Sequence, residues 1–280
     1  MHARIPVDYA APVLRAMKVH RLTVVGAVHA DRATSSDGIH FADDPHNPVL
    51  GTDPPHSIGD VSSFVFDYHT SSYLATIKMF FAVNTSANYT SPRRSVGIST
   101  TRDPTAWPQP IRALTADDID DRWAVAPAAQ AQQNRTELYG LSSFAYQSQY
   151  VGLLWVAHFN AETDGTIEVE LVSSRDGKLW RRADAQADGA RPKLIPRGPA
   201  AWDGMMVHTS THPLLINDML HLYYQGDSCS HHHGQCLKAK TGAAPAVGLA
   251  TLRRDGEVLS RYSLLLSLYC ATVTQVATSL

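Results

Sequence analysis

Cysteine, charge and long apolar runs are all scarce in this sequence of 280 residues. Its three cysteines make no disulfide framework, although Cys229 and Cys236 could pair across a short loop and leave Cys270 over. Charged residues amount to 18% and the formal net charge is −2, so no basic field attracts nucleic acid or an anionic membrane. No apolar run reaches the roughly 18 residues of a membrane-spanning helix. We therefore predict neither a nucleic-acid nor a membrane partner.

Several catalytic signatures are missing too. The sequence has no Gly-x-Ser-x-Gly elbow, no Walker loop, no Rossmann glycine fingerprint and no His-Glu-x-x-His. The loop from Cys229 to Cys236 holds His231, His232 and His233, which could bind Zn²⁺ or Cu²⁺. Their spacing fits no zinc motif, and a solvated loop is the simpler interpretation. We predict no cofactor and no metal. The alternatives are a metal ion bound by the histidines of this loop and a central Ca²⁺.

Localisation is unknown from the sequence. Three N-glycosylation acceptor patterns, which begin at Asn84, Asn88 and Asn134, argue against the cytosol, but such patterns often arise by chance. Residues 1–11 contain Pro6 and Asp8 and lack the apolar segment of a secretory signal peptide.

What the sequence does contain is a repeated unit. In each copy an alternating strand runs into a tight turn at an aspartate, and in three of the four copies an aromatic residue follows the turn. The aspartates are Asp37, Asp103, Asp176 and Asp255, spaced by 66, 73 and 79 residues. The aromatic residues are Phe41, Trp107 and Trp180. Such a unit cannot bury its apolar face alone, so the repeat predicts an array of packed units.

A β-hairpin precedes each of the last three copies. The hairpins join residues 60–66 to 73–80, 139–146 to 150–158, and 208–216 to 219–225. Strand, turn, strand, loop, strand, aspartate turn and strand together make a propeller blade. A β-sandwich also has regular strands, but it would not repeat the aspartate turn and aromatic at this period.

We therefore predict an all-β fold of the five-bladed β-propeller type, with about four blades recognisable. The chain is expected to form a single propeller domain over residues 1–280, with blade units at about 20–45, 60–112, 137–182 and 205–260. The first unit is incomplete. Residues 115–133 form an insertion outside the blades, with weak helical character, and residues 261–280 are a divergent tail.

Three acids are in phase with the repeat. Asp60, Glu137 and Asp203 stand where the innermost strands open, at spacings of 77 and 66 residues, so they should meet at the central pocket. Carboxylates that face one cavity can catalyse glycoside hydrolysis: one protonates the leaving oxygen, and another acts as nucleophile or as base for water. The simpler alternative is that these acids cap turns.

Side chains near these acids suit a sugar. Flat aromatic faces pack against the C–H side of a sugar ring, and hydroxyl and imidazole groups supply hydrogen bonds. Trp155 and Tyr223 lie in mid-strand and are expected to be core residues. The predicted substrate-binding residues are Trp202, His208, Tyr139, His158 and Thr209.

Several segments carry a family resemblance. They are Tyr150–His158 with Thr166–Trp180, Arg94–Ser99, Trp202–His208 and Ala246–Gly256. They resemble the glycosyl hydrolase-like five-bladed β-propellers of the β-fructosidase and arabinanase superfamily (glycosyl hydrolase families 32 and 43). The resemblance implies three acids from successive blades that act as nucleophile or base, as an orienting group that tunes pKa, and as general acid. By position these roles fall on Asp60, Glu137 and Asp203.

Two departures bear on activity. The Asn-Asp-Pro-Asn and Glu-Cys motifs of fructosidases are missing, and no fifth blade is recognisable, so we expect a truncated propeller. The aspartate turns also resemble sialidase Asp boxes, but Arg93, Arg94 and Arg112 stand at no inner-strand opening. We predict a glycoside hydrolase-like protein that acts on a furanoside or related glycan. The alternatives are a non-catalytic propeller that binds carbohydrate or protein, and a non-functional fragment.

Overall fold

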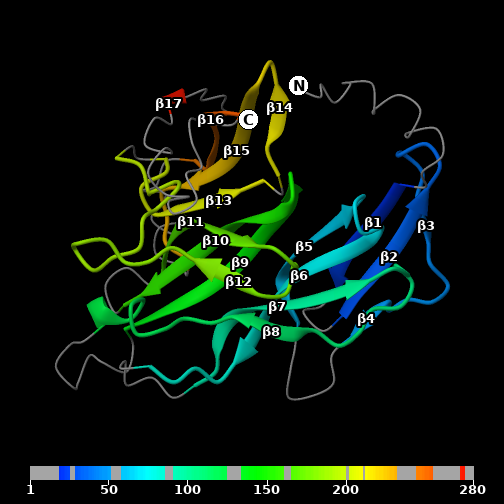
Figure 1. The fold of residues 1–280 in the computed structure, drawn as a ribbon, viewed down its shortest axis with the longest axis horizontal. Helices are drawn as coiled ribbons and strands as arrows, with labels where there is room; N and C mark the ends of the chain where they lie inside the picture. Colours follow the sequence, from blue (N-terminus) through cyan, green and yellow to red (C-terminus); the bar gives the residue numbers. More distant parts are fainter. Residues whose placement is uncertain are drawn as a thin grey trace.

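The computed structural model describes residues 19–25, 29–51, 58–85, 91–124, 134–160, 165–199, 202–210, 212–231, 244–254 and 272–274. Within these ranges the secondary structure is β-strand, apart from the short 3-10 helix η2 (Arg122–Ala124) in the predicted insertion. The strands follow one another around the molecule from the blue β1–β4 to the yellow and orange β13–β16 (Figure 1). The predicted all-β fold is confirmed.

The first two blades are separate four-stranded sheets. In the first, β1 (Val19–Val25), β3 (Ala42–Asp43) and β4 (Leu50–Gly51) all pair with β2 (His29–Ser35). The second is an antiparallel meander of β5 (Ile58–Asp67), β6 (Ser72–Phe81), β7 (Arg93–Thr101) and β8 (Ile111–Leu114).

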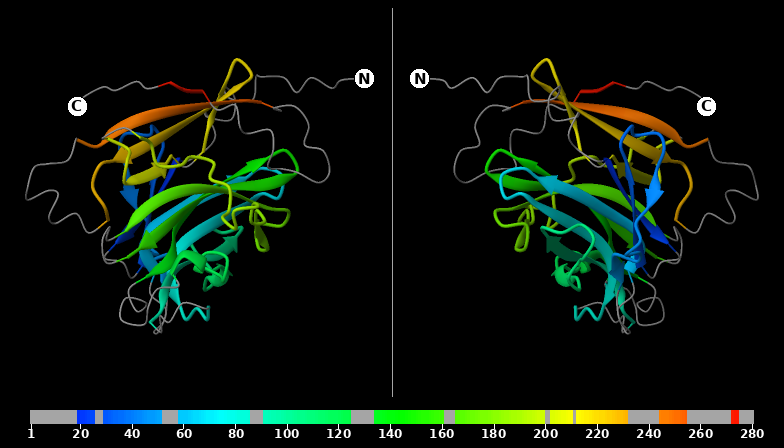
Figure 2. Two further views of the ribbon diagram at one scale, coloured as in Figure 1. Left: turned by 90° about the vertical axis from the view of Figure 1, so that its left-hand side faces the viewer. Right: turned by 90° about the vertical axis from the view of Figure 1, so that its right-hand side faces the viewer.

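The third and fourth blades share one sheet, because Ile167 of β11 pairs in parallel with Met206 of β13. The third blade consists of β9 (Arg135–Tyr146), β10 (Gln149–Phe159), β11 (Thr166–Ser174) and β12 (Trp180–Arg182). The fourth consists of β13 (Met206–Thr209), β14 (Leu214–Ile216), β15 (Met219–Asp227), β16 (Ala246–Arg253) and β17 (Thr272–Thr274). Figure 2 shows how strongly the sheets twist.

The three predicted hairpins are present as β5–β6, β9–β10 and β13/β14–β15. Of the predicted tail, β17 pairs with β16, and the other residues of 261–280 lie outside the described ranges. The grouping of all units into one domain stays a prediction.

The repeated aspartates shape their turns with their side chains. Asp37 Oδ1 accepts hydrogen bonds from the amides of the residues two and three positions on, both at 2.8 Å, and Asp176 Oδ1 does the same at 2.8 Å. These bonds hold the pKa of the Asp176 carboxyl below its usual range. Glycine follows both aspartates with a positive φ of 76° or 70°, which a Cβ would strain. Asp103 accepts from the amide of Thr105 at 2.9 Å, and Asp255 lies outside the described residues.

The tryptophan after the turn folds back onto it, as the repeat predicts. Trp180 Nε1 donates to the carbonyl of Gly177 at 3.1 Å, and Trp107 Nε1 donates to the carbonyl of Pro104 at 3.2 Å. In each case the acceptor follows the aspartate directly. Both indoles are buried and belong to apolar clusters, so the repeat joins each turn to the core.

The core lies between blades. Leu74, Val96 and Ile98 of the second blade pack against Leu138 and Leu154 of the third. A second cluster joins Leu153 and Val169 of the third blade to Val207, Leu222 and Tyr224 of the fourth.

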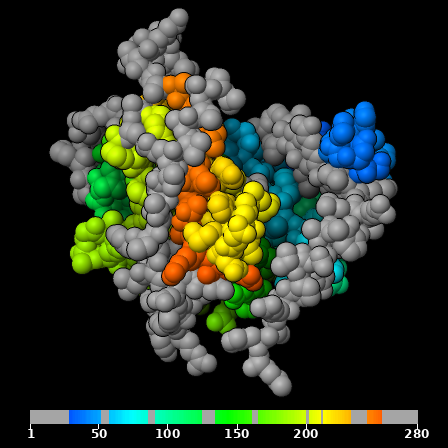
Figure 3. Space-filling view, turned by 90° about the horizontal axis from the view of Figure 1, so that it is seen from above, coloured from blue at the N-terminus to red at the C-terminus, as the bar shows by residue number. Residues whose placement is uncertain are grey.

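The outer face of the fourth blade is exposed, and the prediction for one residue there is wrong. Tyr223, expected in the core, is 42% exposed because β15 turns it away from the buried Leu222 and Tyr224. Leu214, Leu215, Ile216 and Val247 are also exposed in this region. The β14–β15 hairpin (yellow) lies beside β16 (orange) at the surface in Figure 3. Trp155 is partly buried and packs against the core, as expected.

Candidate functional site

Asp60 and Glu137 occupy the same place in two neighbouring blades. Each is the third residue of its strand, Asp60 in β5 and Glu137 in β9, and these two strands lie in contact. The cations that pair with them are Lys78 of β6, Arg94 of β7 and Arg135 of β9. We call Asp60, Lys78, Arg94, Glu137 and Tyr139 the central cluster.

Asp60 is the accessible acid of the cluster. Its side chain is 70% exposed and forms an ion pair with the ammonium of Lys78, which is 5% exposed. Partial burial raises the pKa of Asp60, but the hydrogen bond and charge of Lys78 outweigh it, so the pKa lies below its ordinary value. Burial lowers the pKa of Lys78 more than the carboxylate raises it. Asp60 is therefore ionised at neutral pH.

Glu137 is buried and held by two arginines. Its side chain is 2% exposed; Oε2 accepts from Arg94 Nη1 at 2.5 Å, and Oε1 accepts from Arg135 Nε at 2.5 Å. The amide of Arg94 also donates to Oε2, at 3.4 Å. A carboxylate that accepts hydrogen bonds at both oxygens is fixed in position. Without its cationic partners, the burial of this charge would be strongly unfavourable.

Tyr139 connects the acids to an aromatic group, which consists of the rings of Tyr139, His208, His231 and Trp155. The Lys78 ammonium lies 4.3 Å from the centre of its ring, and its hydroxyl bonds to His231 Nε2 at 2.9 Å. Burial raises the pKa of Tyr139, and the negative charges of Asp60 and then Glu137 raise it further. The predicted sugar-binding residue His208 is 6.1 Å from the Tyr139 ring, centre to centre.

The aromatic group continues along the fourth blade. His208 lies 5.0 Å from the ring of Trp155, whose Nε1 donates to Thr209 Oγ1 at 2.9 Å. Burial lowers the pKa of His208 to about 4, so its imidazole is neutral at pH 7. Tyr139 and His208 thus have neighbouring rings, and Thr209 is bonded to the indole of Trp155; the role of these residues in sugar binding stays a prediction.

Asp203 and Trp202 lie in the turn before β13. Asp203 is 5% exposed, and the ring of Trp202 stacks on Tyr224 at 5.8 Å and 21°. The carboxylate of Asp203 fits against Gly198, and Trp202 against Gly226, so closely that an added Cβ at either glycine would overlap the side chain. The negative charge of Asp203 also acts on the hydroxyl of Tyr224. The convergence of Asp203 with Asp60 and Glu137 stays a prediction.

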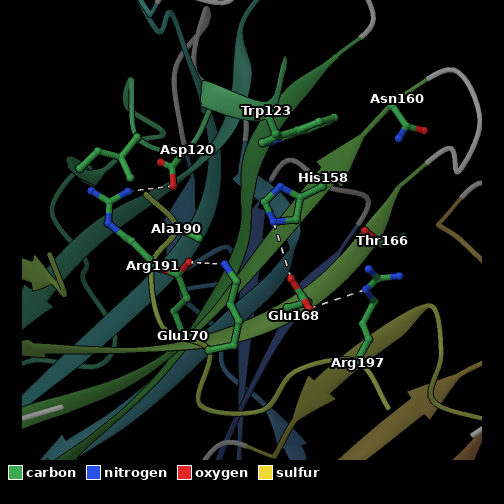
Figure 4. A pocket seen from close by; sticks show the side chains of 12 residues that line it. Asp120, Trp123, His158, Asn160, Thr166, Glu168, Glu170, Ala190, Arg191 and Arg197 are labelled. Atoms are coloured by element: carbon green, nitrogen blue, oxygen red, sulfur yellow. Dashed lines mark hydrogen bonds and ion pairs between the residues drawn. The ribbon is translucent and has the colours of Figure 1, made fainter. Parts of the chain in front are cut away.

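His158 lines a different space, a cavity of about 340 Å³ that it shares with Trp123 and Glu168 (Figure 4). Its Nδ1 contacts Thr136 Oγ1 at 3.2 Å. Thr136 and Glu137 are consecutive in β9, and consecutive side chains of a strand point to opposite sides. His158 therefore lies across β9 from the Glu137 carboxylate.

Sequence reasoning missed the cations and the cavity. Lys78 was detectable, because it is the one charged residue in the apolar strand Leu74–Phe81. Arg94 and Glu168 gave no such signal, since charged residues at strand ends are common on exposed surfaces.

The described residues contain no group of three or more His, Cys, Asp or Glu that could hold a metal. His231 packs against Tyr139 and Phe159 rather than lying free in a solvated loop, while His232 and His233 fall outside the described ranges. Cys229 forms a disulfide. Across the described ranges, no helix has the length and apolarity required to span a membrane.

No protein-family model and no curated protein matches the sequence. One solved structure represents family GH130, mannoside phosphorylases among which are glycoside hydrolases that target β-1,2-mannosidic linkages in Candida mannan. It aligns with 85% of this chain and 64% of its own, at a TM-score of 0.52 and 17% identity. A candidate glycoside hydrolase from Parabacteroides distasonis aligns with 84% of this chain and 68% of its own, at a TM-score of 0.50 and 15% identity.

The chain thus spans about two thirds of the length of these two structures, 64% and 68%. A GH32 β-fructofuranosidase from Bombyx mori aligns more weakly, at a TM-score of 0.48 and 11% identity, over 84% of this chain and 43% of its own. The chain has the fold of the glycoside hydrolase-like β-propellers.

Proposed function

We propose that the chain is a glycoside hydrolase-type protein that acts on a furanoside or a related glycan through Asp60, Glu137 and Asp203. The observation that carries the proposal is the shared position of Asp60 and Glu137, each third in a neighbouring inner strand. Glycoside hydrolysis needs two carboxyl groups with different tasks, and their environments differ strongly here. The fold supports this reading, because solved structures with the same fold include glycoside hydrolases.

The environments suggest how the tasks are divided. Asp60 is exposed and ionised, as a nucleophile, or a base that activates water, must be. Glu137 is buried between Arg94 and Arg135, so its role is to fix those cations and the field around Asp60. Asp203 is the proposed general acid, which protonates the leaving oxygen as the glycosidic bond breaks.

The sugar would lie against the aromatic group beside these acids. Tyr139 and Trp202 offer flat apolar faces, and His208 and Thr209 offer hydrogen bonds. Because the His208 imidazole is neutral, it can accept a hydrogen bond at one nitrogen and donate at the other. A neutral hydroxyl-rich ligand suits such a surface.

The test is hydrolysis of a panel of furanosides and mannosides, with and without inorganic phosphate. We expect Asp60→Asn to lower kcat by at least about a hundredfold, as loss of a base or nucleophile does. Asp218→Asn is the matched control, because Asp218 is 86% exposed in the turn before β15. Unchanged turnover in Asp60→Asn, Glu137→Gln and Asp203→Asn would overturn the proposal.

A leaving-group series separates the roles. The acidic phenol of an aryl glycoside can leave as a phenolate without being protonated, whereas the alcohol of an alkyl glycoside needs a proton from the general acid. Asp203→Asn should therefore lose activity on the alkyl substrates and keep it on the aryl ones. Asp60→Asn should lose both. Equal losses on both substrates in Asp203→Asn would remove Asp203 from the role of general acid.

One observation favours the second candidate, a non-catalytic carbohydrate- or protein-binding propeller. Asp60 and Glu137 are both already engaged in ion pairs. In that case the cluster serves as a rigid polar floor for a ligand. Saturable glycan binding that persists in Asp60→Asn, together with no turnover by the unsubstituted chain, would favour this candidate.

A further inference from the structure

The cavity beside Trp123 is built from three segments that are distant in sequence. Trp123 comes from η2, His158 and Glu168 from the facing ends of β10 and β11, and Lys193 and Arg197 from the segment after β12. Figure 4 shows Trp123, His158, Glu168 and Arg197 directed toward one space. Its volume of about 340 Å³ is within the range of about 300–1,000 Å³ that is typical of small-molecule pockets.

One wall of the cavity is a fixed aromatic ring. Trp123 is 39% exposed, and its Nε1 donates to the buried Thr136 Oγ1 at 2.9 Å. The His158 ring meets it edge to face at 5.5 Å and 86°. An exposed indole that is held at its nitrogen is a preformed platform, so little side-chain entropy is lost when a ring packs on it.

The charges of the lining balance. Three carboxylates (Asp120, Glu168 and Glu170) face three cations (Arg191, Lys193 and Arg197). Burial lowers the pKa of His158 to about 3, so its imidazole adds no charge at neutral pH. A lining without net charge favours a neutral polar ligand over an ion.

Most of these charges are already bonded, but Glu168 is available. Asp120 and Glu170 accept short bonds, for example from Arg191 at 2.9 Å and Lys193 at 2.7 Å. Glu168 has its described cationic neighbours, Arg197 and His158, at 3.7 and 3.9 Å, which is beyond hydrogen-bond length. Its carboxylate can therefore accept bonds from two hydroxyls of a ligand.

We propose that this cavity is a second carbohydrate site, which binds a neutral sugar ring against Trp123 with its hydroxyls on Glu168 and Arg197. It lies across β9 from the central cluster, because Thr136 faces Trp123 and the next residue, Glu137, faces Arg94 and Arg135. The cavity site thereby includes His158, which is expected from the sequence to lie near the three acids. The site is independent of catalysis, so it can exist whether or not the central cluster hydrolyses glycans.

Titration calorimetry with methyl mannoside, methyl fructofuranoside and mannobiose tests the site. The background is Asp60→Asn, which removes the proposed turnover but leaves the cavity intact. Glu168→Gln should weaken binding of the best probe about tenfold or more, as expected for loss of a charged acceptor. Trp123→Ala should weaken it by a similar factor, and Tyr68→Ala, which removes a 66% exposed aromatic residue elsewhere, should not.

Two further measurements make the result decisive. Trp123→Phe keeps an aromatic platform and should retain most of the binding, which covers the case in which Trp123→Ala does not fold. Gluconate and glucosamine, which carry a charge, should bind more weakly than the neutral probes. The proposal is overturned if folded Glu168→Gln binds like the parent, if no neutral probe binds, or if a charged probe binds best.

Discussion

The most demanding stability prediction concerns the ion pair of Arg93 and Asp121, which joins the second blade to the segment before the third. Both side chains are 0% exposed, and their closest atoms are 2.5 Å apart. Asp121 Oδ1 also accepts from the amide of Thr136 at 2.9 Å, at the start of β9. In Asp121→Ala the buried guanidinium loses its counter-ion, and this should cost about 3–5 kcal/mol of the free energy of unfolding.

The assay is thermal and urea unfolding followed by circular dichroism. At about 2–4 °C per kcal/mol for a chain of this size, Tm should fall by about 6–20 °C. The double variant Arg93→Met with Asp121→Leu should lose less than Asp121→Ala, because an apolar pair leaves no buried charge. Asp218→Asn, at an exposed turn, is the control, because asparagine tolerates the positive φ of 58° at this position. A loss below about 1 kcal/mol in Asp121→Ala, or a double variant as unstable as the single one, would refute the reasoning.

Three other predictions follow from single contacts. The pKa of His158 falls from 6.5 to about 3 on folding, so between pH 6.5 and 3 the unfolded chain binds more protons than the folded one. The free energy of unfolding should therefore decrease as the pH is lowered through that window, and His158→Gln should reduce this decrease, as measured by urea midpoints. Trp180→Phe keeps an aromatic ring but loses both the bond to the carbonyl of Gly177 and part of the buried indole, and should cost at least about 0.5–1.5 kcal/mol in urea unfolding; no change would contradict this prediction. Gly198→Ala should displace the Asp203 carboxylate and lower hydrolysis of alkyl glycosides; full activity would argue against Asp203 as the acid.

The parts of the fold that the sequence predicted are local. The turns at Asp37 and Asp176 depend on bonds that span two or three residues, and the indole of Trp180 reaches back only three, so a short segment contains all the information. The third position of Asp60 and Glu137 in their strands follows from the same phase.

What the sequence could not predict depends on long-range partners. Arg94 bonds Glu137 across 43 residues, and nothing near either residue indicates the other. The sequence gives no strand register, and a shift of one residue moves a side chain to the opposite face, so it could not place His158 on the cavity side of β9. Tyr223 has the composition of a core residue, and only the arrangement of β15 and β16 leaves it exposed.

The pairing order of the strands has a consequence for how the chain reaches this structure. In the second and third blades every strand pairs with its neighbour in sequence, whereas blades meet mainly through side chains. Loop closure is cheap for such hairpins and slower for distant contacts. We expect β9–β10 and β5–β6 to be protected from hydrogen exchange early during refolding. The contact between Arg93 and Asp121, and with it the cavity beside Trp123, should form only in a later kinetic phase.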